Sequence, residues 1–401
     1  MNKWGSRPST VCVWVFLLLV ALPFTAVAQT AVKPIRIGGT LSITGPSADN
    51  ALWVKRAYEY WVEKTNKSGG LLGRPVELLI YDDEAKPDKA VQLLEKIITV
   101  DKVDLVSGAY GPATCGGQMP VAEKYGMVYV SMGAHMISFS QGFKYSFSAT
   151  PLMGDWLSSA FFKFLESLSQ KDRPKSVAFV RLNNPVGRAA LANERGWAEK
   201  LGIKIALEEF YDPPLAMADA IVSKAKERNA DLFFCTEFFP DAVLTVRSMK
   251  SLGYNPKFFE QGAAATVPAW SQTLGPDGNY VFQGAIITNS LPSAGIKELN
   301  QVVKERWGES RAPEYFLFGY SWLETLQRGV EGAKSLNQDA IRDYLKNNEI
   351  SIIAGKFRFD EKGLPPPYSY VVQVQNGRTE VVYPADKRTA APIFPKPPWG
   401  K

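Results

Sequence analysis

Few side chains in this sequence could build a metal centre or a hydrolytic active site. The chain contains a single histidine, His135, and three cysteines, Cys12, Cys115 and Cys235. Zinc sites of the usual type need several Cys or His ligands, and one histidine cannot make a His-rich site. A Ser-His-Asp triad could use only His135, and no G-x-S-x-G nucleophile motif occurs. We therefore expect no catalytic residue, no metal and no enzymatic activity.

Motifs for phosphate and dinucleotide binding are also missing. The glycine-rich stretch 69–74 (GGLLGR) precedes an apolar strand pattern instead of linking a strand to a helix, so it is no dinucleotide fingerprint. No G-x-x-x-x-G-K-[ST] sequence is present. Asp82 and Asp83 end a strand just before a helix, where a turn and helix-capping role is favoured over acid–base chemistry. We expect no cofactor.

The segment 42–53 (SITGPSADNALW) has the composition of a loop that binds a small molecule. It follows the apolar run Ile35–Leu41 and combines a Thr-Gly-Pro turn with the start of an amphipathic pattern. A helix start presents free N–H groups and a partial positive charge, which suit a carboxylate or water. Phosphate fits less well, because glycines are few and no lysine is placed for it. A surface turn that packs only on itself is the alternative.

Short apolar runs alternate with helical patterns along most of the chain. Leu52–Asn66 and Pro87–Val100 repeat apolar residues at helical spacing. The predicted strands are Ile35–Thr40, Val76–Tyr81, Asp104–Gly108, Val128–Ser131, Val177–Leu182, Lys204–Glu208, Asp231–Cys235, Lys257–Glu260 and Val281–Ile287. This alternation predicts an α/β fold with two doubly wound parallel-sheet lobes. Because ligands bind at the carboxyl ends of such strands, the loops predict a cleft between the lobes.

The N-terminus has the features of an export signal. A basic start and the apolar run Val11–Val20 are followed by Ala26 and Ala28, which stand at the usual sites before cleavage. We expect residues 1–28 to be a signal peptide and the mature protein to be soluble in the periplasm. An uncleaved N-terminal anchor is the alternative.

The charge and the cysteines of the chain without its signal argue against a nucleic-acid-binding surface and against a disulfide. Removing Lys3 and Arg7 lowers the formal charge from +6 to +4, and the remaining basic residues are mixed with acidic ones. The sequence therefore shows no basic stripe suited to nucleic acid. Cys12 leaves with the signal, whereas Cys115 and Cys235 fall in different predicted lobes. Two free or buried thiols are favoured over a disulfide.

Three stretches carry a resemblance to a known family. They are IRIGGTLSITGP near the start, GGLLGRPVEL with the later DD, and AGKFRFDEKG near the end. Together they resemble the periplasmic solute-binding proteins of ABC transporters, of the branched-chain amino acid (Leu/Ile/Val) binding type. The resemblance covers about residues 34–365. It implies a type I periplasmic binding protein, whose two lobes are joined by three crossovers, close on a small ligand and dock on a membrane permease.

The same resemblance implies how the chain is divided. Lobe 1 would hold residues 34–149 and 289–352, and lobe 2 would hold 150–288 and 353–385. Residues 386–401 are a proline-rich tail, expected as an extended strap or a disordered end. We expect a monomer that serves a permease. A periplasmic ligand sensor on the same clamp, with a signalling partner, is the alternative.

The resemblance also implies ligand-binding positions on both lobes. They are Asn50, Trp53, Tyr110, Pro112, Ala113, Thr114, Ala134 and His135 on lobe 1, and Val186, Phe238 and Gly262 on lobe 2. For His135 a buried structural role is the alternative, and for Phe238 it is core packing. Tyr110 either stacks on the ligand or shields the hinge.

We expect two further groups of residues to have structural roles. Tyr315, Phe316 and Phe318 lie at helical spacing, which favours core packing. Glu237 lies beside Phe238 and is interpreted as a helix cap, with a polar contact as the alternative.

Departures from the family pattern bear on the ligand. Amino-acid binders of this family hold the ammonium group with a second-lobe carboxylate, where this sequence has Gly262; Pro112 replaces a serine and Val186 a tyrosine. A buried ammonium group without a partner costs several kcal/mol. We therefore expect an aromatic or short aliphatic carboxylate without an ammonium group, in preference to a branched-chain amino acid. Glu237 or Glu260 serving as the ammonium partner is the alternative.

The first testable prediction concerns export. We expect the mature chain to start at or near Gln29 and to be recovered from the periplasm, because the signal ends on Ala-Val-Ala. Mass spectrometry of the purified N-terminus measures this. Membrane-bound protein that retains Met1 would contradict it.

Overall fold

The computed structural model describes residues 1–2, 4–5, 32–132, 136–150, 153–262, 264–291, 293–366 and 369–400. The chain divides into Met1–Lys33 and Pro34–Lys401, and every assigned helix and strand belongs to the second unit. The predicted signal features between Val11 and Ala28 lie outside the described residues. In the described part of the chain, no helix is both long and apolar enough to cross a membrane.

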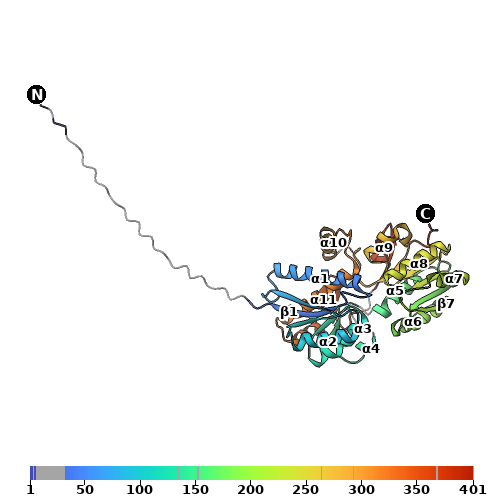
Figure 1. The fold of residues 1–401 in the computed structure, drawn as a ribbon, viewed down its shortest axis with the longest axis horizontal. Helices are drawn as coiled ribbons and strands as arrows, with labels where there is room; N and C mark the ends of the chain where they lie inside the picture. The colour runs from blue at the N-terminus through green and yellow to red at the C-terminus, as the bar shows by residue number, and fades with distance from the viewer. Residues whose placement is uncertain are drawn as a thin grey trace. The chain divides into compact units, whose positions relative to one another are not determined.

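The first sheet of the described chain has five parallel strands in the order β2-β1-β3-β4-β5. The strands are β1 Ile35–Leu41, β2 Val76–Asp82, β3 Leu105–Ser107, β4 Tyr129–Ser131 and β5 Ser146–Ser148. The helices between them are α1 Ala48–Lys67, α2 Pro87–Thr99, α3 Pro112–Lys124 and α4 Met136–Phe139. Figure 1 shows β1 among the helices α1, α2 and α3 and the later helix α11, Glu314–Ala333. Because β1 lies between β2 and β3, this sheet is doubly wound, as the alternating sequence pattern predicts.

The second sheet has seven strands within the described ranges, in the order β14-β13-β10-β9-β8-β6-β7. They are β6 Ser176–Leu182, β7 Lys204–Tyr211, β8 Leu232–Cys235, β9 Phe258–Gln261, β10 Phe282–Ala285, β13 Tyr370–Gln375 and β14 Arg378–Tyr383. The associated helices are α5 Met153–Ser167, α6 Pro185–Leu201, α7 Ala218–Glu227, α8 Phe239–Ser251, α9 Pro268–Leu274 and a 3-10 turn Gly275–Gly278. Strands β6 to β10 repeat the doubly wound order, and the antiparallel β13 and β14 extend the edge beyond β10.

The chain returns to the first sheet after β10. The returning elements are α10 Ala294–Trp307, α11 Glu314–Ala333, α12 Gln338–Asn347 and the hairpin β11 Ile350–Ile352 with β12 Gly355–Phe357. Beyond them, Gly363 accepts a hydrogen bond from the Ser148 N–H at 2.9 Å, and the Phe359 ring lies 5.0 Å from that of Phe147. The chain rejoins the second sheet only from Tyr370. We therefore propose that lobe 1 continues through Leu364, beyond the expected end at 352.

The helices α1 and α11 touch backbone to backbone. A Cβ atom added at Gly319 would lie 2.9 Å from the carbonyl oxygen of Val54 and 3.0 Å from its Cα. Glycine at this position therefore sets the distance between the two helices. The large side chains on either side, Trp53 and Phe316, then pack across the gap with ring centroids 6.5 Å apart.

The proline-rich tail packs against the second sheet near the start of β9. It contains a 3-10 turn, Ala385–Lys387, and then runs extended. Phe394 stacks on Phe258 with ring centroids 5.1 Å apart, and the Trp399 indole N–H donates to the Tyr254 carbonyl at 3.0 Å. These contacts make the tail a strap, the first of its two expected forms.

The two cysteines within the described residues are buried free thiols. Cys115 lies on α3, beside the first sheet, and Cys235 ends β8 in the second sheet. The prediction of two thiols in place of a disulfide is confirmed.

The contact between α1 and α11 makes a prediction about stability. We expect Gly319→Ala to lower the free energy of unfolding by ~1–3 kcal/mol, because the added methyl group forces two backbones apart. The matched control is Gly196→Ala in α6, where the new Cβ meets nothing within 4 Å. That change should stabilise the protein by up to ~1 kcal/mol through helix propensity alone. Urea unfolding measures both, and an equal gain for the two variants would contradict the close contact.

Candidate functional site

The carboxyl ends of β1 and β3 meet at the switch point of the first sheet. In a doubly wound sheet this is where loops leave to opposite faces and where ligands bind. The segments after these strands carry Asn50, at the start of α1, and Tyr110, just before α3. The Asn50 side-chain amide donates to the Tyr110 hydroxyl at 2.9 Å. Two of the predicted positions, 60 residues apart in the chain, are thereby in direct contact.

Two carboxylates hold the loop between β1 and α1. Asp83 is fully buried and accepts a hydrogen bond from the Ser42 hydroxyl at 2.7 Å. Asp82 accepts bonds from both the hydroxyl and the backbone N–H of Thr44, at 2.6 and 3.2 Å. The predicted turn role of this pair is confirmed. Its helix-capping role is wrong, because α2 begins after Lys86 and has no side-chain cap.

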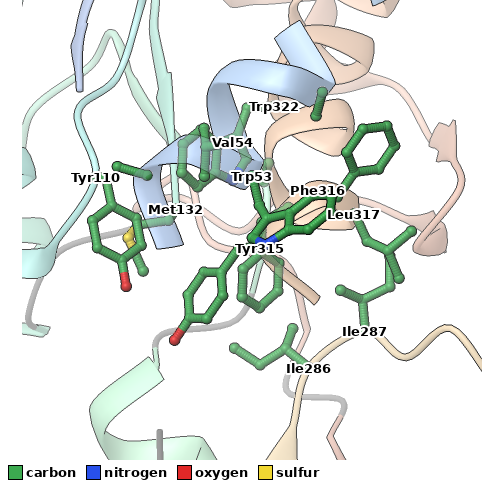
Figure 2. Close-up of a cluster of buried hydrophobic side chains, with 14 of the residues drawn as sticks. Trp53, Val54, Tyr110, Met132, Ile286, Ile287, Tyr315, Phe316, Leu317 and Trp322 are labelled. Atoms are coloured by element: carbon green, nitrogen blue, oxygen red, sulfur yellow. The ribbon is translucent and has the colours of Figure 1, made fainter. Parts of the chain in front are cut away.

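Tyr315 on α11 lies directly against Tyr110. The two rings are nearly perpendicular, with centroids 5.5 Å apart, and both lie at one side of a buried cluster, away from Trp322 (Figure 2). Burial raises the pKa of the Tyr110 hydroxyl to about 12, so this group stays a neutral donor at physiological pH. Burial of Tyr315 confirms the predicted core packing, but its contact with a site residue was missed.

The first turn of α3 presents backbone N–H groups beside Tyr110. Pro112 is the first residue of the helix and Ala113 is exposed, so the Ala113 N–H lies at the positive end of the helix dipole. The hydroxyl of Thr114, a predicted ligand-binding residue, is turned toward the protein backbone. It is buried and donates back to the Tyr110 and Gly111 carbonyls, at 2.6 and 2.8 Å. This hydroxyl is therefore engaged with the protein backbone.

Trp53 lies among the aromatic rings of α1, α10 and α11. Its ring centroid is 5.9 Å from that of Trp307, and the Arg56 guanidinium lies 4.4 Å above the ring. Only 8% of the residue is exposed. The structure therefore places Trp53 in aromatic packing between α1, α10 and α11. Ala134 and His135 lie outside the described residues.

The predicted positions of the second sheet lie at the carboxyl ends of three strands. Val186 is in the first turn of α6, after β6, and its side chain lies outside the described part. Phe238 is half-buried and directly precedes α8, after β8. Gly262 follows β9 and donates its N–H to the Cys235 carbonyl at 2.9 Å. An added Cβ would lie 2.7 Å from the Thr236 hydroxyl, so this position has little room for a side chain.

Two buried carboxyl groups near this edge point into the lobe. Glu237 accepts a hydrogen bond from the Thr245 hydroxyl at 2.7 Å, and burial raises its pKa to about 7. Its interpretation as a helix cap is wrong, because α8 begins after Phe238 without a side-chain cap. Burial also raises the pKa of Glu260 well above its ordinary value, and the neighbouring Arg181 charge lowers it in part. Neither carboxyl group is exposed by more than 1%.

The comparisons with known proteins agree with this architecture. The family model of periplasmic binding proteins matches residues 34–379. The chain therefore belongs to the periplasmic binding protein family, whose members bind substrates for transporters and are not enzymes. The predicted family and the predicted two-sheet α/β fold are confirmed.

Individual relatives place the chain within this family. Leu/Ile/Val-binding protein homolog 7 of Brucella abortus is 23% identical over 393 residues, which cover 91% of this chain and 96% of the relative. The Streptococcus pneumoniae branched-chain amino acid transporter substrate-binding protein, solved with isoleucine, has a TM-score of 0.78 at 19% identity and covers 88% and 100% of the two chains. An R. palustris solute-binding protein of an ABC transporter, solved with benzoate, has a TM-score of 0.76 at 14% identity and covers 91% and 98%.

The buried Glu237 gives a prediction about pH. Its folded pKa, about 7 against an ordinary 4.5, means that the folded state holds a proton that the unfolded state releases between these values. Stability of the native protein therefore falls as pH rises from 4.5 to 7. Glu237→Gln removes this fall, so we expect it to gain up to ~3 kcal/mol over the native protein between pH 5 and pH 8.

Denaturant unfolding at the two pH values measures this gain. The control is Glu349→Gln at an exposed position, which should leave the pH profile unchanged. A constant difference between Glu237→Gln and the native protein would show that Glu237 is charged in the fold.

Proposed function

We propose that this chain is the substrate-binding component of an ABC uptake transporter that captures a small carboxylate without an ammonium group. The ligand is an aromatic or short aliphatic acid, held between the two lobes and delivered to a membrane permease. The signal peptide over residues 1–28 would export the chain to the periplasm.

One observation carries the ligand class. At the position where the family's amino-acid binders hold the ammonium group, this chain has Gly262, and a Cβ there would lie 2.7 Å from the Thr236 hydroxyl. The two carboxyl groups that could replace a missing partner, Glu237 and Glu260, are buried within the second lobe. An ammonium group closed into this cleft would lose its hydration without gaining a counter-charge.

The first lobe supplies donors suited to a carboxylate. The Ala113 N–H lies at a helix start, and the Asn50 amide and the Tyr110 hydroxyl form a polar pair beside it. We add Tyr315 to the proposed site because its ring packs on Tyr110. Phe238, on the opposite lobe, gives the cleft an apolar face. The benzoate complex of the R. palustris protein shows that this fold accommodates such a ligand in a relative.

Calorimetry of the mature protein tests the ligand class. We expect micromolar or tighter binding by at least one of benzoate, phenylacetate and butyrate, and no binding by leucine, isoleucine or valine. At 100 times its dissociation constant such a ligand adds ~2.7 kcal/mol to stability, so a thermal-shift screen identifies it first. Binding of a branched-chain amino acid, with the plain acids silent, would contradict the proposal.

Two tyrosine variants test the site in the same titration. Tyr110→Phe removes the hydroxyl bonded to Asn50 and should weaken binding about tenfold. Tyr254→Phe removes a comparable buried hydroxyl, bonded to the Ala230 carbonyl at 2.8 Å in the second lobe, and should leave the affinity unchanged. Equal losses in both variants would indicate a general loss of stability instead of a lost ligand contact.

A further inference from the structure

A buried carboxyl group joins the two lobes at the start of α11. Glu314 belongs to a helix that packs on α1 of the first lobe, yet its hydrogen-bond donors come from the second. The Thr266 hydroxyl, in the loop after β9, donates to Oε2 at 3.0 Å. Gln283 on β10 donates to the same oxygen at 3.4 Å, and the Ile286 N–H donates to Oε1 at 3.4 Å. The carboxyl group thus lies on the hinge.

The surroundings of Glu314 contain no balancing cation within the described residues. Arg311, three residues earlier, instead reaches Glu380 at 3.3 Å and the Thr379 carbonyl at 3.0 Å. The side chain of Glu314 is 7% exposed, and burial raises its pKa to about 8. Among the described residues, the titratable groups on which its charge acts are two neutral hydroxyls, Tyr110 on the first lobe and Tyr315 on its own helix.

These two tyrosines connect Glu314 to the proposed ligand site. Tyr315 follows Glu314 directly in the chain, and its ring packs on Tyr110 with centroids 5.5 Å apart, so the carboxyl group lies close to the tyrosine pair of the proposed site. Burial raises the pKa of both hydroxyls, and the Glu314 charge raises it further. A ligand carboxylate bound beside Tyr110 would act on Glu314 in the same way. Two negative charges in one buried region are unfavourable, so the ligand favours a neutral Glu314.

We infer that Glu314 couples ligand binding to proton uptake: the cleft closes on a carboxylate ligand when this hinge carboxyl group is neutral, and ionised Glu314 opposes closure. The inference rests on the proposed function, because only a ligand with net negative charge produces this coupling. The proton comes from solvent and is bound at a Glu314 carboxyl oxygen. Thr266 and Pro313 line a surface hollow of about 190 Å³, which brings solvent close to this group.

The pH dependence follows from the sign of the shift. Below pH 8 Glu314 is mostly neutral and binding proceeds without proton exchange. Above pH 8 each unit of pH lowers the neutral fraction tenfold, so the dissociation constant for benzoate, phenylacetate or butyrate should rise about tenfold between pH 7 and pH 9. At pH 8, titrations in phosphate and in Tris should differ by the ionisation heat of about 0.5 proton taken up per ligand.

The decisive variant is Glu314→Gln, which keeps the shape of the side chain and cannot ionise. We expect its dissociation constant to be the same at pH 7 and pH 9 and its binding heat to be independent of the buffer. Glu237→Gln is the matched control, since it removes another buried carboxyl group of raised pKa and should retain the native pH dependence. Thr266→Val removes a donor that favours the charged form, so the pH midpoint should move upward.

The outcomes separate this inference from the proposed function. Binding of a plain carboxylate with no pH dependence, or with a dependence that survives in Glu314→Gln, overturns the role of Glu314 and leaves the ligand class intact. Binding of only leucine, isoleucine or valine, or of none of the acids, overturns both. Should Glu314→Gln fail to fold by circular dichroism, the upward shift in Thr266→Val still decides, and its absence overturns the inference.

Discussion

The close packing of α11 on α1 is the contact on which the proposed ligand site depends. The chain leaves the first sheet after β5, builds most of the second sheet, and returns in α10 to α12. Gly319 lets the returning helix approach the backbone of Val54, and this fixes the first turn of α11 against the switch point of the first sheet. Tyr315 then meets Tyr110, and Glu314 meets the donors of the second lobe. A larger residue at position 319 would move all of these groups together.

The electrostatic character of the site follows from what each lobe contributes. The first lobe offers N–H and hydroxyl donors, which are neutral dipoles. The buried carboxyl groups of the second lobe, Glu237 and Glu260, face its interior. Fixed dipoles in a region of low dielectric stabilise an anion without a formal counter-charge. We expect such a site to select its ligand by charge, and its aromatic rings to select the ligand by shape.

The sequence alone predicted the fold and named Asn50 and Tyr110, which the structure brings into contact, while their role in ligand binding stays a prediction. Alternating strand and helix periods determine a doubly wound sheet, and its switch point determines that Asn50 and Tyr110 lie near each other. Helical spacing showed that Tyr315 is buried, but periodicity cannot tell which distant residue a buried side chain will meet. Glu314 was missed for the same reason. Local rules failed where a polar group has two possible partners: Glu237 turns to Thr245 and leaves the start of α8 uncapped.

The strap formed by the C-terminal tail bears on how the protein can be handled. Regular structure ends near Lys387, so a chain trimmed there would look complete by its helices and strands. Phe394, however, packs against Phe164 and Phe258 in the apolar cluster of the second lobe. Removing the strap would leave a patch of phenylalanine rings open to water, a feature that promotes aggregation. We therefore expect a chain trimmed at Lys387 to aggregate more readily than the full chain.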